Sequence, residues 1–416
     1  MISCFEIKMN NHYLQEESMR KLLSITLASV MALSIVACGN TQEATTTAAA
    51  TTAAATTAAA SEAATDETEA AASEADAVVE AAIENTKKRT GEQTVWDGPT
   101  SGPKAATGKK IAIVNANAES GAEKKWGDYT EEAAKRIGWE TVTLDGKGTV
   151  QGQLDAINQA IAMKVDGIYT SADAASLQSG MDAAKEAGIP VVGVHAAGNP
   201  GPDEEIGLFY NCSSGPEDIG TAMAEYALAD SNGTARVIIL YDSNYEIARR
   251  KTSAMQETIE SCPTATLLEV VNSPMSEIPT QVPQLMTSWV SKYGSEPFYV
   301  LCISDAYYDF AASTLRSGGV ATDQVRLIGS DGVEAAYDRI RNREYQIGTV
   351  PEPGALFGYC VIDEFNRAFN GEEAYTYKPS IYIVTPDNVD AEGGDQGLYI
   401  PSNNFADHYA EIWGVE

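Results

Sequence analysis

Basic residues and cysteines are scarce in this sequence of 416 residues. It has 28 lysines and arginines against 59 aspartates and glutamates, a formal charge of −31, which argues against nucleic acid or another polyanion as a partner. The six cysteines form no CxxC pair and have no histidine at metal-ligand spacing, so no metal site is expected. In the expected folded region four cysteines remain, Cys212, Cys262, Cys302 and Cys360, and disulfides among them stay open. Apolar surroundings favour buried free thiols over a disulfide for Cys302 and Cys360.

Common catalytic motifs are also missing. The sequence contains no GxSxG, no Walker loop, no HExxH and no GxGxxG after the first predicted strand, so neither an enzyme nor a cofactor is expected. One alternative stays open, because a pair of carboxylates can cleave glycosides as acid and base. The carboxylates available for it are Glu119, Glu123, Asp331 and Glu352.

Long hydrophobic runs are absent except near the N-terminus. Leu22 to Val36 is apolar but shorter than the about 20 residues of a spanning helix. Met19-Arg20-Lys21 precedes this run and Ile35-Val36-Ala37-Cys38 ends it, a pattern that resembles a bacterial lipobox. The resemblance implies that 19–37 is a lipoprotein signal peptide, that Cys38 is acylated, and that 1–18 is an upstream extension. An ordinary signal peptide or membrane anchor is the alternative.

The next segment, 38–108, is expected to be a linker and an N-terminal extension. Residues 40–75 are mostly threonine and alanine, too poor in large apolar side chains to fold. Residues 76–89 have helical composition, and the sequence WDGPTSGP at 96–103 ends any helix.

The remaining chain contains a duplicated pattern. Asp166 to Ala196 predicts a strand, a helix and a second strand, and Pro297 to Gly332 repeats this plan. From Lys109 onward the order strand, helix, strand, helix, strand, helix, strand occurs twice. We therefore predict an α/β fold of two Rossmann-like lobes with parallel sheets, joined by a multi-strand hinge. The predicted lobes are 109–213 plus 353–380, and 214–352 plus 381–416.

This order of elements resembles the type I periplasmic binding proteins of the ribose and galactose kind. The matching segments are spread over 109–386 and include KKIAIV, VDGIYTSADA, GIPVVGV, PFYVLCISD, RLIGSDG and IGTVPEP. The resemblance implies that a polar solute binds between the lobes. Desolvation makes unpaired polar groups costly in such a cleft, so side chains from both lobes are expected to pair with the solute.

The resemblance also carries individual residues. Arg249 and Asp331 match the family's ligand-binding arginine and aspartate, while Ser304 and Glu352 stand where asparagine and glutamine are usual. Candidates for ligand contact also come from the loop after the first strand, from strand ends and from aromatic side chains: Asn117, Glu119, Ser120, Trp126, His195, Tyr245 and Asp305.

Departures from the sugar-binding pattern leave structural alternatives open. His195-Ala196 replaces the usual Asp-Arg pair, so His195 is either a ligand contact or a hydrogen-bonded structural histidine. Asp331 can instead cap a helix, and Arg249 can belong to a solvated basic turn. Because of these departures, a common pyranose or ribose is not assumed as the solute.

The expected function is that of an extracytoplasmic, lipid-anchored, monomeric receptor that delivers a sugar-like solute to the permease of an ABC importer. The sequence leaves two alternatives open. One is a sensory receptor that presents its ligand to a membrane kinase or chemoreceptor, and the other is a binder of a nucleoside or an autoinducer.

Overall fold

The computed structural model describes residues 75–119 and 121–415. The predicted upstream extension, the signal peptide, the acylation site Cys38, most of the linker and the candidate Ser120 lie outside these residues. Among the helices of the described part, none has the length and apolarity to cross a membrane.

The first lobe is built on a sheet of order β2-β1-β3-β4-β6-β5, in which the edge strand β5 is antiparallel and the others are parallel. Its strands are β1 (Lys110–Asn115), β2 (Glu140–Asp145), β3 (Gly167–Thr170), β4 (Val191–Val194), β5 (Gly201–Asp203) and β6 (Leu208–Cys212). Its helical elements are α3 (Gly121–Arg136), α4 (Val150–Ala162), η1 (Ala174–Leu177), α5 (Gln178–Glu186) and α11 (Gly354–Asn370).

Helices cover both faces of this sheet, which explains why β1 is apolar from Ile111 to Val114. Ile111 and Ile113 are buried with residues of α3 and α11, whereas Ala112 and Val114 are buried with residues of α4 and α5. Alternate side chains of a strand point to opposite faces, so a strand covered on both sides needs apolar residues at every position.

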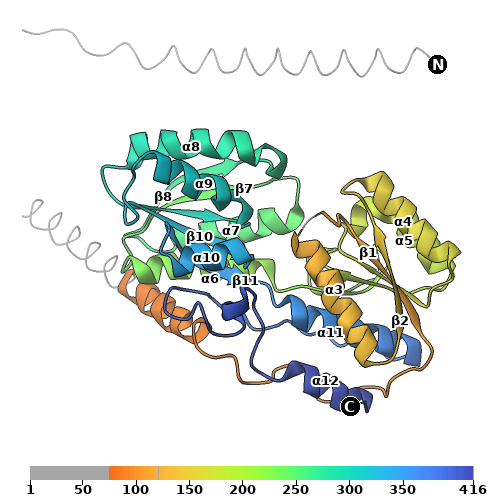
Figure 1. The fold of residues 1–416 in the computed structure, drawn as a ribbon. Coiled ribbons are helices and arrows are strands. Elements are labelled where there is room, and N and C mark those ends of the chain that lie inside the picture. Colours follow the sequence, from red (N-terminus) through yellow and green to blue (C-terminus); the bar gives the residue numbers. More distant parts are fainter. Residues whose placement is uncertain (1–74, 120, 416) are drawn as a thin grey trace, which may run out of the picture. The chain divides into compact units, whose positions relative to one another are not determined.

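The second lobe repeats this plan around a parallel sheet of order β11-β10-β9-β7-β8 (Figure 1). Its strands are β7 (Arg236–Tyr241), β8 (Thr266–Asn272), β9 (Phe298–Cys302), β10 (Val325–Asp331) and β11 (Gln346–Pro351). Its helical elements are α6 (Pro216–Asp230), α7 (Glu246–Glu260), η2 (Met275–Glu277), α8 (Ile278–Tyr293), α9 (Ala306–Ser317) and α10 (Glu334–Arg341). The predicted α/β fold with two parallel-sheet lobes is confirmed.

The C-terminal segment corrects one predicted boundary. Residues 381–416 were assigned to the second lobe, but α12 (Phe405–Trp413) is buried in the core of the first. Trp413 stacks on Tyr359 of α11 at 5.8 Å, and its Nε1 donates a hydrogen bond to Asp363. Val384 forms one antiparallel bridge with Thr349 of β11. Aromatic residues on α12 bury more apolar surface against α11 than an exposed tail would.

The N-terminal extension contacts both lobes. Residues 75–89 form the expected helix, and Val79 and Ala82 are part of the core of the second lobe. Figure 1 shows this helix beside α6, where Asn85 donates a hydrogen bond to Glu225. Trp96 packs instead against the first lobe, stacked on His408 at 5.0 Å.

A buried glutamate in α11 predicts a pH dependence of stability. Burial, with the neighbouring charge of Asp363, raises the pKa of Glu364 to about 9. The folded chain therefore holds a proton that the unfolded chain releases above its ordinary pKa near 4.5. Between these two pKa values, rising pH lowers the free energy of unfolding, by about 1.4 kcal/mol per pH unit for one proton.

Glu364→Gln should make the stability less dependent on pH, because glutamine stays neutral. Urea denaturation between pH 5 and pH 8.5, where the carboxylate of the unfolded chain is ionised, measures the difference in slope. Parallel slopes for the variant and the wild type would show that Glu364 does not hold its proton in the folded state.

Candidate functional site

A cavity of about 150 Å³ lies where the carboxyl ends of strands from both lobes meet. His195 follows β4 of the first lobe, Ser304 follows β9 of the second, and Asp331 ends β10. Loops and helix N-termini at the carboxyl ends of parallel strands are the usual places for ligands in α/β folds. The cavity is lined by Trp126, His195, Tyr245, Ile247, Ala248, Lys251, Met275, Ile303, Ser304, Asp331 and Glu352.

Six residues predicted from the sequence line this cavity together. Two of them belong to the first lobe and four to the second, as expected for a site shared by both lobes. The six are Trp126, His195, Tyr245, Ser304, Asp331 and Glu352.

A buried charge cluster forms one wall. Glu352 Oε1 lies 3.5 Å from His195 Nε2 and 4.0 Å from Lys251 Nζ, and the side chain of Glu352 is only 3% exposed. Lys251 Nζ lies 3.7 Å from Asp331 Oδ1 and 3.2 Å from Ser330 Oγ. The cations lie close enough to stabilise the carboxylates, but at longer distances than good charge-assisted hydrogen bonds.

The charge cluster keeps Glu352 ionised. Burial alone would raise the pKa of this carboxyl, but the nearby His195 and Lys251 outweigh burial and lower it to about 2. Neither oxygen of Glu352 has a hydrogen-bond partner among the described residues, and the same holds for His195 Nε2. A buried ionised group without hydrogen bonds is costly, so a ligand that donates to Glu352 gains the energy of satisfying it.

A contact with Ser213 holds one side of the His195 ring. Ser213 Oγ lies 3.0 Å from His195 Nδ1 and donates to the carbonyl of Ser214 at 2.8 Å. The other ring nitrogen, Nε2, then faces Glu352 and the cavity. His195 therefore contacts Ser213, as the structural alternative expects, and also lines the cavity, so ligand contact by His195 stays a prediction.

Two cavity residues adopt the left-handed backbone conformation. His195 has φ 55° and Asp331 has φ 93°, values that cost energy in residues with a Cβ atom. Asp331 is not the residue that caps α10, since the N-cap position is Val333. The turn after each strand thus directs a polar side chain toward the cavity.

Aromatic and apolar side chains complete the lining. The ring of Trp126 lies 5.0 Å from that of His195, and Phe357 meets the other side of this histidine edge-on at 5.6 Å. Tyr245 is about half exposed, at 49%, and stands at the N-terminus of α7. Aromatic faces beside buried carboxylates suit a ligand with both C–H and O–H groups.

Four other predicted residues do not line the cavity. Asn117 accepts a hydrogen bond from the backbone of Glu119, which is exposed. Arg249 is also exposed and donates to the carbonyl of Ser243, as the alternative of a solvated basic turn anticipated. Asp305 is completely buried beneath the site and accepts three hydrogen bonds, from Gly332, Gln346 and Thr349. The hydrogen-bond capacity of Asp305 is used inside the protein.

Sequence reasoning missed Lys251, although a signal was present. Lys251 directly follows Arg249 and Arg250 in the sequence, and such a basic run is typical of a solvated surface. It lies three residues after the buried Ala248 and four before the buried Met255. Helical spacing therefore places this lysine on the inward face of α7.

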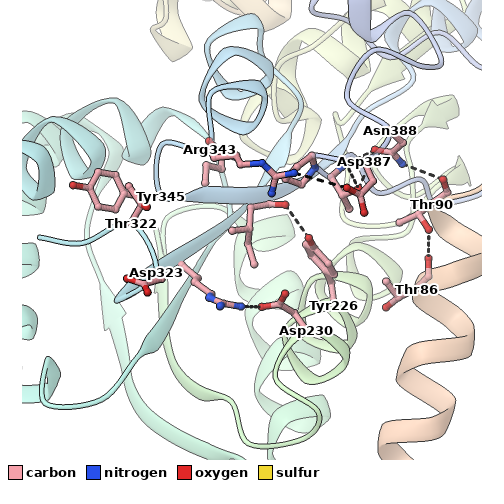
Figure 2. Close-up of a pocket in the computed structure, with 15 residues that line it drawn as sticks. Thr86, Thr90, Tyr226, Asp230, Thr322, Asp323, Arg343, Tyr345, Asp387 and Asn388 are labelled. Carbon is pink, nitrogen blue, oxygen red and sulfur yellow. Dashed lines mark hydrogen bonds and ion pairs between the residues drawn. The ribbon is translucent and has the colours of Figure 1, made fainter.

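A larger cavity, about 650 Å³, lies at the opposite end of the second lobe's strands, next to the start of β11 (Figure 2). Its polar groups mostly pair with one another. Tyr226 donates to the carbonyl of Ile347, Arg326 pairs with Asp230, and Asn388 donates to the carbonyl of Thr90. These satisfied groups make it a weaker candidate than the cavity around Glu352.

The chain matches a family model over residues 111–373, and that family is described as a periplasmic binding protein domain. The match covers more than half of the chain. The chain belongs to the periplasmic binding protein family. Proteins of this family bind substrates outside the cytoplasm, so this periplasmic binding protein is extracytoplasmic and is not an enzyme. A comparison with curated protein sequences found no match.

Solved structures confirm the type I fold of this periplasmic binding protein. One is the arabinose-transporter component of Shewanella sp. ANA-3, bound to arabinofuranose, with 16% identity, TM-score 0.60, and coverage of 69% of this chain and 95% of that one. Another is a solute-binding protein of Agrobacterium vitis bound to tagatopyranose, with 14% identity, TM-score 0.61, and coverage of 70% and 99%. A XylFII–LytSN complex matches with 16% identity, TM-score 0.57, and coverage of 68% and 100%.

Proposed function

We propose that this periplasmic binding protein captures a sugar or a sugar-like polar small molecule in the cavity around Glu352 and delivers it to the permease of an ABC importer. The observation that carries the proposal is the carboxylate of Glu352, which is buried and ionised and has no hydrogen-bond partner among the described residues. Hydroxyl groups of a solute are the donors that such an acceptor needs.

The size and lining of the cavity support a small solute. A volume of about 150 Å³ is below the usual range for drug-sized ligands, about 300–1,000 Å³. Lys251 lies within 4.0 Å of both Glu352 and Asp331, so part of their negative charge is offset before any solute binds and the solute does not have to be a cation. Trp126 and Tyr245 offer aromatic faces to sugar C–H groups.

A panel of solutes tests this proposal. Purified protein is heated with pentoses, hexoses, furanoses, polyols and nucleosides, and unfolding is followed by differential scanning fluorimetry. A true solute at one hundred times its dissociation constant should stabilise the protein by about 2.7 kcal/mol. If no member of the panel raised the melting temperature, and native mass spectrometry found no retained solute, sugar capture would be wrong.

The membrane partner distinguishes transport from sensing. The alternative to transport is sensing, in which the ligand-bound protein is presented to a membrane sensor. The similar XylFII–LytSN complex is the observation that supports this alternative. Pull-down from detergent-solubilised membranes with the solute present should recover a permease if the protein serves transport. Recovery of a kinase without a permease would favour sensing.

Attachment to the membrane through acylated Cys38 is part of the proposal. Its support is the sequence Ile35-Val36-Ala37-Cys38 after an apolar run. Metabolic labelling with an alkyne fatty acid should label the wild-type protein but not Cys38→Ala, and labelling of both would place the acyl group elsewhere.

A further inference from the structure

Two buried cysteines of the first lobe face each other. Cys212 is the last residue of β6, and Cys360 lies in the second turn of α11. Their sulfur atoms are 3.1 Å apart, and the two residues are 1% and 4% exposed. Both therefore lie in the packed core, where neighbouring side chains hold them next to each other.

The other two cysteines of the described residues have no such arrangement. The sulfur of Cys262 lies near the carbonyl of Gly233 and the hydroxyl of Thr264. Cys302 has no cysteine partner in the described part of the chain. Both are as deeply buried as the pair, at 1% and 0% exposure, so they serve as internal controls.

The extracytoplasmic location of the family allows these two thiols to be oxidised to a disulfide. The family is extracytoplasmic, and disulfides form and persist outside the reducing cytoplasm. We propose that Cys212 and Cys360 form a disulfide bond in the exported protein. In the structure both cysteines are free thiols, as the sequence predicts for Cys360 from its apolar surroundings. Their distance along the chain gave no sign that they lie side by side.

The oxidation requires a partner disulfide, supplied by a thiol–disulfide oxidoreductase or an oxidised low-molecular-weight thiol. One cysteine thiolate attacks this disulfide, forms a mixed disulfide and releases one thiol. The second cysteine thiolate then displaces the remaining thiol, so two protein thiols become one disulfide while the oxidant becomes two thiols. Burial raises the pKa of the Cys212 thiol in the folded lobe, so the exchange takes place before β6 and α11 pack.

The position of the pair determines what the bond would do. The chain leaves the first lobe after Cys212 and returns at the start of α11, so residues 213–359 include every strand of the second lobe. Closing such a long loop restricts the unfolded chain strongly. Because both cysteines belong to the first lobe, the bond does not join the two lobes, and solute affinity should be unchanged.

Thiol mapping of the full chain tests the proposal. Protein exported from its bacterial host is purified without reductant, denatured in iodoacetamide and digested, with and without prior reduction. We expect Cys212 and Cys360 to be linked in one peptide pair and alkylated only after reduction, whereas Cys262 and Cys302 are alkylated in both samples. Alkylation of Cys212 and Cys360 without reduction, even after incubation with oxidised glutathione, would overturn the proposal.

Single variants and melting curves provide a second test. In Cys212→Ala the remaining Cys360 should become alkylated without reduction, and continued protection would show that protection does not come from the pair. Reduction should lower the melting temperature of the wild type on the order of 5 °C. Cys262→Ala should keep this shift, whereas a Cys212→Ala/Cys360→Ala variant should lose it.

Discussion

Replacing Glu352 with glutamine should weaken solute binding about 100-fold, which corresponds to about 2.7 kcal/mol. The carboxylate is nearly the same size as the amide, so the cavity keeps its shape. The variant nevertheless loses the acceptor charge that a solute hydroxyl would meet. It also leaves Lys251, which is 5% exposed, with Asp331 as its one remaining counter-ion within 4.0 Å among the described residues. Isothermal titration calorimetry with the solute found in the panel measures the effect.

Glu257→Gln is the matched control for this substitution. Glu257 is exposed and lies on α7, the helix that carries Lys251. The same change of charge at this position should alter affinity by less than about twofold, because exposed charges interact weakly through water. If Glu352→Gln folded normally and bound the solute as tightly as this control does, Glu352 would not be a ligand contact.

Replacing Asp305 with alanine should lower the free energy of unfolding by about 4 kcal/mol. Its carboxylate accepts hydrogen bonds from Gln346, Thr349 and the backbone of Gly332 at 2.7, 2.7 and 2.9 Å. Alanine leaves the Thr349 hydroxyl and the Gly332 N–H unpaired in a site with no exposed surface, and it removes one of the two acceptors of Gln346 Nε2, the other being the carbonyl of Gly348. Urea denaturation measures the loss.

The exposed Asp323 of the same lobe provides the control, and Asp323→Ala should cost less than about 0.5 kcal/mol. The folded fraction of Asp305→Ala should still bind the solute, since Asp305 does not line the cavity. A stable variant that had lost binding would instead support the role predicted for Asp305 from the sequence.

Most of the fold could be predicted from the sequence, because local residue patterns determine where its strands and helices form. The alternation of buried strands and amphipathic helices predicted a strand, a helix and a second strand over Asp166 to Ala196, where the structure has β3, α5 and β4. Local patterns did not predict where the C-terminal segment packs. The position of α12 depends on Trp413 and Tyr409 packing on α11, a contact between distant segments. Periodicity indicates which face of a helix is apolar but does not identify the partner that covers it.

The residues of the candidate site also fall into those that could be predicted from the sequence and those that could not. The family resemblance pointed to Asp331 and Glu352 and, through the position of the usual Asp-Arg pair, to His195, and all three line the cavity. Arg249 and Lys251 show the limit of this reasoning. They are two residues apart on one helix, so their side chains point to nearly opposite sides and only one of them faces inward. Which of the two faces the core depends on how α7 is rotated about its axis, and α7 buries Ala248, Lys251 and Met255.

A crystal structure of protein purified without denaturation, with its solute retained or added, tests the central claim most directly. We predict a hydroxyl-bearing solute within hydrogen-bonding distance of the Glu352 carboxylate, with an aromatic face of Trp126 or Tyr245 against its C–H groups. A solute bound instead in the cavity beside Arg343 and Asp387 (Figure 2), with the Glu352 carboxylate still without a donor, would contradict it.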